Sequence, residues 1–150
     1  MNAVSVQEAD FDAGAEIAAL AADDVDAGAV ASFVGLVRQD KHDGEVAAMT
    51  LEHYPGMTEQ ALAGIVAQAR ERWQCRNVRV IHRVGKLLPG ERIVFVGVAS
   101  AHRHDAFAAC EFIMDYLKTQ APFWKREETA AGGRWVDARE SDDRAADRWK

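Results

Sequence analysis

The chain has 150 residues, which fits a single domain spanning residues 1–150, and 49% of them are hydrophobic, enough to build a core without a disulfide or a metal. Its 18 Lys and Arg against 24 Asp and Glu give a net charge of -6, which disfavours nonspecific binding to nucleic acid. We expect neither a membrane anchor nor a secretory signal, because no apolar run approaches roughly 18 residues and residues 1–25 are acidic.

The first third of the chain predicts strands separated by one helix. Val4 and Val6 alternate with polar residues, as in a short strand, and Asp12 can cap a helix that runs to about Ala22. The continuous apolar run 28–37 predicts a buried strand. Residues 46–53 read as a returning strand, which predicts a hairpin with a long polar loop here.

The rest of the chain alternates helices and pairs of strands. Helical spacing of apolar residues predicts the helices, and runs rich in branched residues predict the strands. The predicted elements are a helix after Thr58, strands at 78–82 and 93–99, a helix from Ser100 to just before Pro122, and a final hairpin of 123–128 with 135–138. This order predicts an α+β domain with a largely antiparallel, mixed sheet.

Cysteine and histidine usage gives no sign of a metal site. Cys75 and Cys110 are far apart and form no CxxC pattern, so we expect no disulfide and a reducing, cytoplasmic location. His82 alternates into a strand, where a core histidine is more common than a ligand. The histidines lack zinc-binding spacing such as HExxH; they are His42, His53, His82, His102 and His104. We therefore expect no metal and no cofactor.

The first candidate site is the start of the helix that follows the strand 93–99. Ser100, Ala101, His102 and Arg103 lie there, and free backbone N–H groups together with the helix dipole favour an anion at such a position. The arginine could hold a phosphate with two hydrogen bonds. The alternative is a solvated helix start with an ordinary cap.

The second candidate site lies at the other end of the same helix. Lys118 falls in the last turn, and Lys125 and Arg126 follow the apolar segment 122–124. A lysine in a last turn often does no more than balance the helix dipole. Three cations around an apolar segment, however, also suit an amine that carries protons or acts as a nucleophile. Arg38 and Arg139 each follow a strand and are weaker candidates.

Helix geometry separates the two candidate sites. Arg103 and Lys118 lie about 22 Å apart along the axis at a rise of 1.5 Å per residue, too far to hold one small anion within a single chain. Either the chain has two sites, or a symmetric dimer brings Arg103 of one copy toward Lys118 of the other. We favour the dimer, because it gathers scattered cations of an acidic protein into one pocket.

Several long segments together resemble the large subunit of molybdopterin synthase: LEHYPGMTEQAL (51–62), IHRVGKLLPGE (81–91), SAHRHDAF (100–107), FIMDYLKTQAPFWKRE (112–127) and RWVDARESD (134–142). The resemblance extends from about residue 28 to residue 150. It implies an α/β hammerhead fold with an additional antiparallel β subdomain. It also implies an enzyme that converts cyclic pyranopterin monophosphate to molybdopterin.

The resemblance further implies partners and roles for single residues. Sulfur would arrive as a thiocarboxylate on the C-terminal glycine of a small ubiquitin-like subunit, and a central homodimer would carry one small subunit at each end. Lys118 and Lys125 match catalytic lysines. The substrate-binding matches are Arg38, His102, Arg103 and Arg139, with Leu36, Val37, Arg126 and Glu127 lining the pocket. From the residues alone a non-catalytic adaptor, binding a ubiquitin-like tail or a phosphorylated pterin or nucleotide, stays open.

Overall fold

In the computed structural model, the described residues are 3–39, 46–129, 132–136 and 140–150. Strands and helices follow one another in a mixed order. They are β1 (Val4–Gln7), α1 (Ala13–Leu20), β2 (Ala29–Leu36), β3 (Val46–His53), α2 (Met57–Arg72), β4 (Cys75–Arg83), β5 (Gly85–Leu87), β6 (Arg92–Ser100), α3 (Arg103–Gln120), β7 (Phe123–Thr129), β8 (Gly132–Val136) and α4 (Glu140–Asp147).

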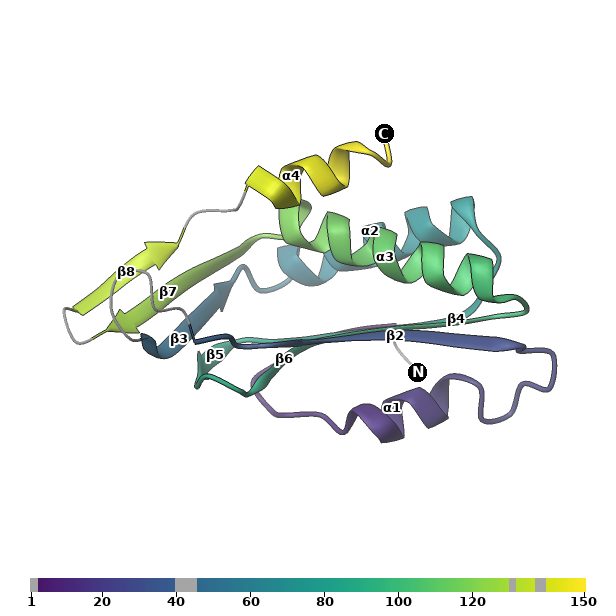
Figure 1. Ribbon diagram of the computed structural model, residues 1–150, viewed down its shortest axis with the longest axis horizontal. Helices are drawn as coiled ribbons and strands as arrows, with labels where there is room; N and C mark the ends of the chain where they lie inside the picture. The colour runs from purple at the N-terminus through teal and green to yellow at the C-terminus, as the bar shows by residue number, and fades with distance from the viewer. Residues whose placement is uncertain (1–2, 40–45, 130–131, 137–139) are drawn as a thin grey trace.

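The first sheet has the strand order β1-β4-β6-β2 and is covered on both faces. Strand β1 is parallel to β4, and the other pairs are antiparallel. Helix α1 lies on one face and α2 and α3 lie on the other (Figure 1). Strand β6 is buried from Ile93 onward because alternate side chains fill both interfaces. Val96 belongs to the larger core under α2 and α3, whereas Phe95 packs with Phe11 and Leu20 beside α1.

The second sheet has the order β5-β3-β7-β8, is wholly antiparallel, and projects beyond the C-terminal end of α3 (Figure 1). The chain crosses from the first sheet to the second between β4 and β5, where Gly85 has a φ of 88° that suits glycine. The predicted α+β class, with a mixed sheet and an added antiparallel sheet, is confirmed. The final hairpin is confirmed as β7 and β8, but its second strand begins at Gly132 and not at residue 135, and residues 137 and 138 lie outside the described residues.

The expected hairpin of residues 28–37 with 46–53 is wrong. Strand β2 pairs with β6 in the first sheet, and β3 pairs with β5 and β7 in the second. Strand β2 is also not buried as expected: it is an edge strand on which Val30, Phe33 and Leu36 are exposed. Apolar composition identified the strand but could not identify its neighbour, because β6 is separated from it by more than 50 residues of sequence.

The C-terminal segment forms α4 on the outer side of α3 (Figure 1). The Trp149 ring meets the rings of Trp73 and Phe112 edge-on at 5.4 and 5.7 Å. Its indole N–H donates to Asp115 at 2.7 Å, and its backbone carbonyl accepts a bond from Arg72 at 2.6 Å. The end of the chain is thus held by its own residues.

Candidate functional site

The end of α3 that carries Lys118 is fixed to the start of α2. The buried hydroxyl of Thr58 donates to the carbonyl of Pro122 at 3.0 Å and accepts the N–H of Tyr54 at 2.9 Å. Helix α2 was predicted to begin after Thr58, but its N-cap is Gly56 and Thr58 lies inside it. Its hydroxyl instead fixes the connection between α3 and β7. The segment between Lys118 and Lys125 therefore has a set path.

Strand alternation decides which way each cation of β7 faces. Phe123 pairs with His53 and Lys125 pairs with Leu51, which is only 1% exposed, so these side chains lie on the inner face of the second sheet. Arg126 is offset by one residue and lies on the outer face. Lys125 and Arg126 thus occupy opposite faces of one strand.

The outer face also carries aromatic side chains. Trp124 precedes Arg126, and Trp135 pairs with Arg126 across the β7–β8 ladder. Their side chains are 47% and 58% exposed. The cation of the outer face therefore sits among exposed indole rings, whereas Lys125 of the inner face is next to buried residues.

His82, on β4, is near enough to both predicted catalytic lysines for their charges to lower its pKa. Its ring is buried and stacks on Phe123 with centroids 4.0 Å apart and planes 22° from parallel. Burial, with smaller contributions from the positive charges of Lys118 and Lys125, lowers the pKa of His82 to about 3. The imidazole is therefore neutral, and its Nδ1, which is 2.9 Å from the carbonyl of Arg83, donates to that carbonyl.

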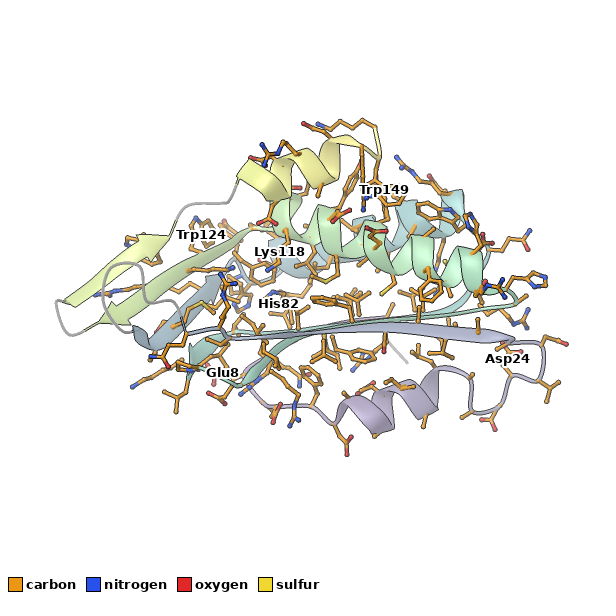
Figure 2. The ribbon with its side chains drawn as sticks, viewed as in Figure 1. Glu8, Asp24, His82, Lys118, Trp124 and Trp149 are labelled. Atoms are coloured by element: carbon orange, nitrogen blue, oxygen red, sulfur yellow. The ribbon has the colours of Figure 1, made fainter. Side chains whose placement is uncertain are left out.

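Lys118 and Lys125 both lie near this neutral ring. Figure 2 shows Lys118 at the end of α3, above His82 and on the side of the second sheet. His53, on β3, also contributes to the lowered pKa of His82. The prediction that His82 is a core histidine is confirmed, since it is buried. Strand alternation could not indicate that both lysines would lie near it.

Arg38 lies at the same end of the first sheet. Strand β6 runs away from this end and α3 returns to it, while β2 is antiparallel to β6 and ends here (Figure 1). Leu36 is exposed, Val37 is buried, and Arg38 follows as an exposed side chain. The strand ends therefore place Arg38 and Lys118 at the junction of the two sheets.

His102 and Arg103 lie at the opposite end of α3. His102 is the N-cap and makes no side-chain capping bond, and both side chains are exposed. Ser100, expected to start the helix, ends β6, and its buried hydroxyl donates to the carbonyl of Gln74 at 2.7 Å. A single chain does not bring this pair near Lys118, because Arg103 and Lys118 are about 22 Å apart along the helix.

Two predicted site residues cannot be placed in full. Arg139 lies outside the described residues, and for Glu127 only the backbone, in β7, is described. Within the described residues, no group of three or more His, Cys, Asp and Glu side chains could hold a metal ion. None of the helices in the described segments is long and apolar enough to cross a membrane.

Fold and site together define a class of protein: an α+β protein of two open sheets, with a cationic cluster where the sheets meet the end of a long helix. The family model described as MoaE protein matches residues 6–120, a range that includes Lys118. The chain therefore belongs to the MoaE family.

Relatives extend the match over nearly the whole chain. A molybdopterin synthase catalytic subunit of Ralstonia nicotianae is 63% identical over 99% of this chain and 85% of its own length. The protein of that name from Escherichia coli is 62% identical over 93% of this chain and 92% of its own length. Both alignments are long enough to reach beyond residue 120.

Solved structures agree with the sequence comparison. The molybdopterin biosynthesis MoaE protein from Burkholderia ambifaria has a TM-score of 0.84 at 57% identity and covers 99% of this chain and 98% of its own. A molybdopterin synthase from Staphylococcus aureus reaches the same TM-score at 27% identity, with 91% and 98% covered.

Proposed function

We propose that this chain is the catalytic, large subunit of a molybdopterin synthase. It converts cyclic pyranopterin monophosphate to the dithiolene molybdopterin, and acts as a sulfurtransferase that inserts two sulfur atoms. The sulfur arrives as the C-terminal thiocarboxylate of a small ubiquitin-like subunit. Membership of the MoaE family and relatives named as catalytic subunits support this activity.

One observation carries the proposal: Lys118 and Lys125 come from different elements and both lie close to the buried, neutral His82. The thiocarboxylate and the pterin phosphate are both anionic and repel each other. Two ammonium groups beside a weakly polar wall offset that repulsion more strongly than they would in bulk water. A neutral imidazole completes the wall without adding a third charge.

The residues then take separate roles. Lys118, at the end of α3, orients the terminal acyl group of the partner, and Lys125 stabilises the charge that develops as sulfur leaves that group. Each delivery passes the sulfur to the pterin, and a water molecule then hydrolyses the acyl group, which leaves the partner's tail as a carboxylate. Cationic side chains bind the phosphate; they are Arg38, His102, Arg103 and Arg139. Leu36, Val37 and Glu127 line the same pocket.

The assembly follows from the geometry of α3. A homodimer brings His102 and Arg103 of one copy to the lysines of the other, and a small subunit binds at each end, giving a heterotetramer. The reaction takes place in the cytoplasm, where Cys75 and Cys110 stay reduced. Burial raises the pKa of both thiols, to about 12 for Cys110, so neither is a reactive thiolate.

Reconstitution tests the proposal. The purified chain is mixed with cyclic pyranopterin monophosphate and thiocarboxylated small subunit, and dithiolene formation is followed. We expect product with the wild-type chain, and loss of product with retained binding of the small subunit for Lys118→Ala. A non-catalytic adaptor would bind the same subunit and give no product under conditions in which an established synthase works, and that result would overturn the proposal.

A further inference from the structure

We infer that Arg83 and Glu91 are positioning residues for Arg38: they hold the turn that clamps the backbone of Val37, and so fix where Arg38 meets the substrate. The inference rests on the proposed function, in which Arg38 binds the pterin phosphate. We assign neither residue a direct contact with that phosphate. Their effect passes through the backbone.

Arg83, the last residue of β4, is a buried arginine whose guanidinium donates hydrogen bonds to backbone carbonyls. Its Nε and Nη2 donate to the carbonyl of Glu8 at 3.1 and 3.0 Å, and its Nη1 donates to the carbonyl of Arg92 at 2.9 Å. Figure 2 shows Glu8 at the end of the first sheet that meets the second. Arg83 therefore ties the segment after β1 to the first residue of β6.

The same guanidinium reaches the turn before β6. Arg83 Nη1 donates to Glu91 Oε1 at 3.4 Å, and Glu91 Oε2 accepts the N–H of Leu88 at 2.6 Å. The backbone N–H of Glu91 donates to the carbonyl of Leu88 at 3.0 Å, and Gly90 has a φ of 92°. One carboxylate thus closes the turn 88–91 and joins it to a buried arginine.

That turn holds both backbone polar groups of Val37. The N–H of Val37 donates to the carbonyl of Glu91 at 2.8 Å, and the N–H of Gly90 donates to the carbonyl of Val37 at 2.7 Å. The register of β2 with β6 shifts between Gly35 and Leu36, where the regular ladder ends. Val37, and Arg38 after it, are therefore placed by the turn and not by the sheet.

The charge balance allows Glu91 to be removed without leaving Arg83 alone. Asp10 Oδ1 lies 3.8 Å from Arg83 Nη1, and the Asp10 carboxylate also accepts two bonds from Arg92, at 3.1 and 2.6 Å. An isolated buried charge would be costly, but here a second carboxylate remains beside the guanidinium. We therefore expect Glu91→Ala to fold.

The kinetic test uses Glu91→Ala and Glu91→Gln in the reconstituted enzyme. Loss of the turn's hydrogen bonds should raise KM for the pterin substrate about tenfold with kcat changed less than about threefold. Glu91→Gln keeps an oxygen that accepts the Leu88 N–H, and should restore KM to within about threefold of the wild type. An unchanged KM in Glu91→Ala would overturn the inference.

A matched control and a double variant separate a positioning effect on Arg38 from a general loss of stability. Glu16→Ala removes a carboxylate 3.3 Å from Arg79, another arginine of β4, on the α1 side of the sheet, and should leave KM unchanged. In an Arg38→Ala background, Glu91→Ala should change KM by less than about twofold, because its effect passes through Arg38. Equal effects with and without Arg38 would overturn the inference.

Amide hydrogen exchange tests the inference without any activity. Glu91→Ala should speed exchange at Val37 and Gly90 relative to Glu16→Ala, because the first variant loosens the clamp and the second does not. Equal protection at these amides in both variants would overturn the inference even if the chain is a synthase. A wild-type chain that makes no product would instead overturn the proposed function. The exchange result would then still decide whether Glu91 holds the backbone of Val37.

Discussion

The two ends of α3 carry candidate site residues in very different surroundings. At the C-terminal end the side chain of Lys118 is exposed, but β7 supplies Lys125 and β4 supplies the buried His82, whose pKa is lowered by the charges of both lysines. At the N-terminal end, His102 and Arg103 are exposed on a helix start without a side-chain cap. The group at the C-terminal end is formed by several elements of one chain, whereas the pair at the N-terminal end lies on an exposed helix start.

The difference follows from what lies beyond each end of the helix. The second sheet continues past the C-terminal end (Figure 1), where it supplies the half-buried Lys125 near the exposed Lys118. At the other end α3 simply follows β6 through exposed residues 101 and 102. A basic side chain can gather an anion only with other donors, so the N-terminal pair gains a function when a second copy brings it to a lysine pair.

The largest effect on turnover should come from substitutions at the C-terminal end of α3. Lys118→Ala or Lys125→Ala should lower kcat by about 100-fold or more, because each removes an ammonium that stabilises charge during sulfur transfer. Lys86→Ala on β5 is the matched control and should keep wild-type turnover, since Lys86 is an exposed lysine that pairs with Thr50 on the outer face. Turnover is measured as dithiolene formed per chain. Full activity in either site variant would contradict the assignment of the cluster.

A smaller effect is expected from the cation next to Lys125. Arg126 lies on the outer face of β7, so Arg126→Ala should reduce kcat/KM by less than about fivefold. The comparison is made in the same assay with Lys125→Ala. If Arg126→Ala is as damaging as Lys125→Ala, both faces of the strand take part in the reaction and the distinction between inner and outer face fails.

Much of this site could be predicted, but its arrangement could not. Apolar periodicity identified α3, and helix geometry already separated Arg103 from Lys118. Local patterns could not show that β2 pairs with β6, because pairing over a long sequence separation depends on which strand offers a complementary face. The same limit hid His82, whose position in a strand was clear but whose neighbours come from α3, β3 and β7.

His82 should make the free energy of unfolding of the chain depend on pH. Its pKa falls from an ordinary 6.5 to about 3 in the folded chain, so only the unfolded chain takes up this proton between those values. The free energy of unfolding should therefore fall as pH falls through this window, by up to about 1.4 kcal/mol per pH unit.

Urea unfolding at pH 7, 6, 5 and 4 checks this. His82→Gln lacks the titration and should show a shallower decline than the wild type, while His104→Gln, which changes an exposed residue of α3, should follow the wild type. Parallel curves for the wild type and His82→Gln would show that the buried ring does not resist protonation.

The smallest effect should come from the cysteines, because the transferred sulfur is delivered by the partner. Cys75→Ala and Cys110→Ala should keep kcat within about twofold. Cys110 is buried on α3 and its thiol lies 3.7 Å from the carbonyl of Val96, so a loss of stability is expected there without a loss of turnover. The measurement is turnover of each variant at a temperature where it stays folded. Loss of product in a folded cysteine variant would mean that the chain itself carries sulfur.

The contrast between the two ends of α3 is tested most directly by mixing two inactive chains. Arg103→Ala and Lys118→Ala are dissociated together and reassociated, so that about half of the dimers contain one chain of each kind. If the exposed helix start of one copy completes the lysine cluster of the other, each mixed dimer regains one intact site, and about a quarter of wild-type activity should return. A mixture that exchanges subunits yet stays as inactive as its separate components would contradict a shared site.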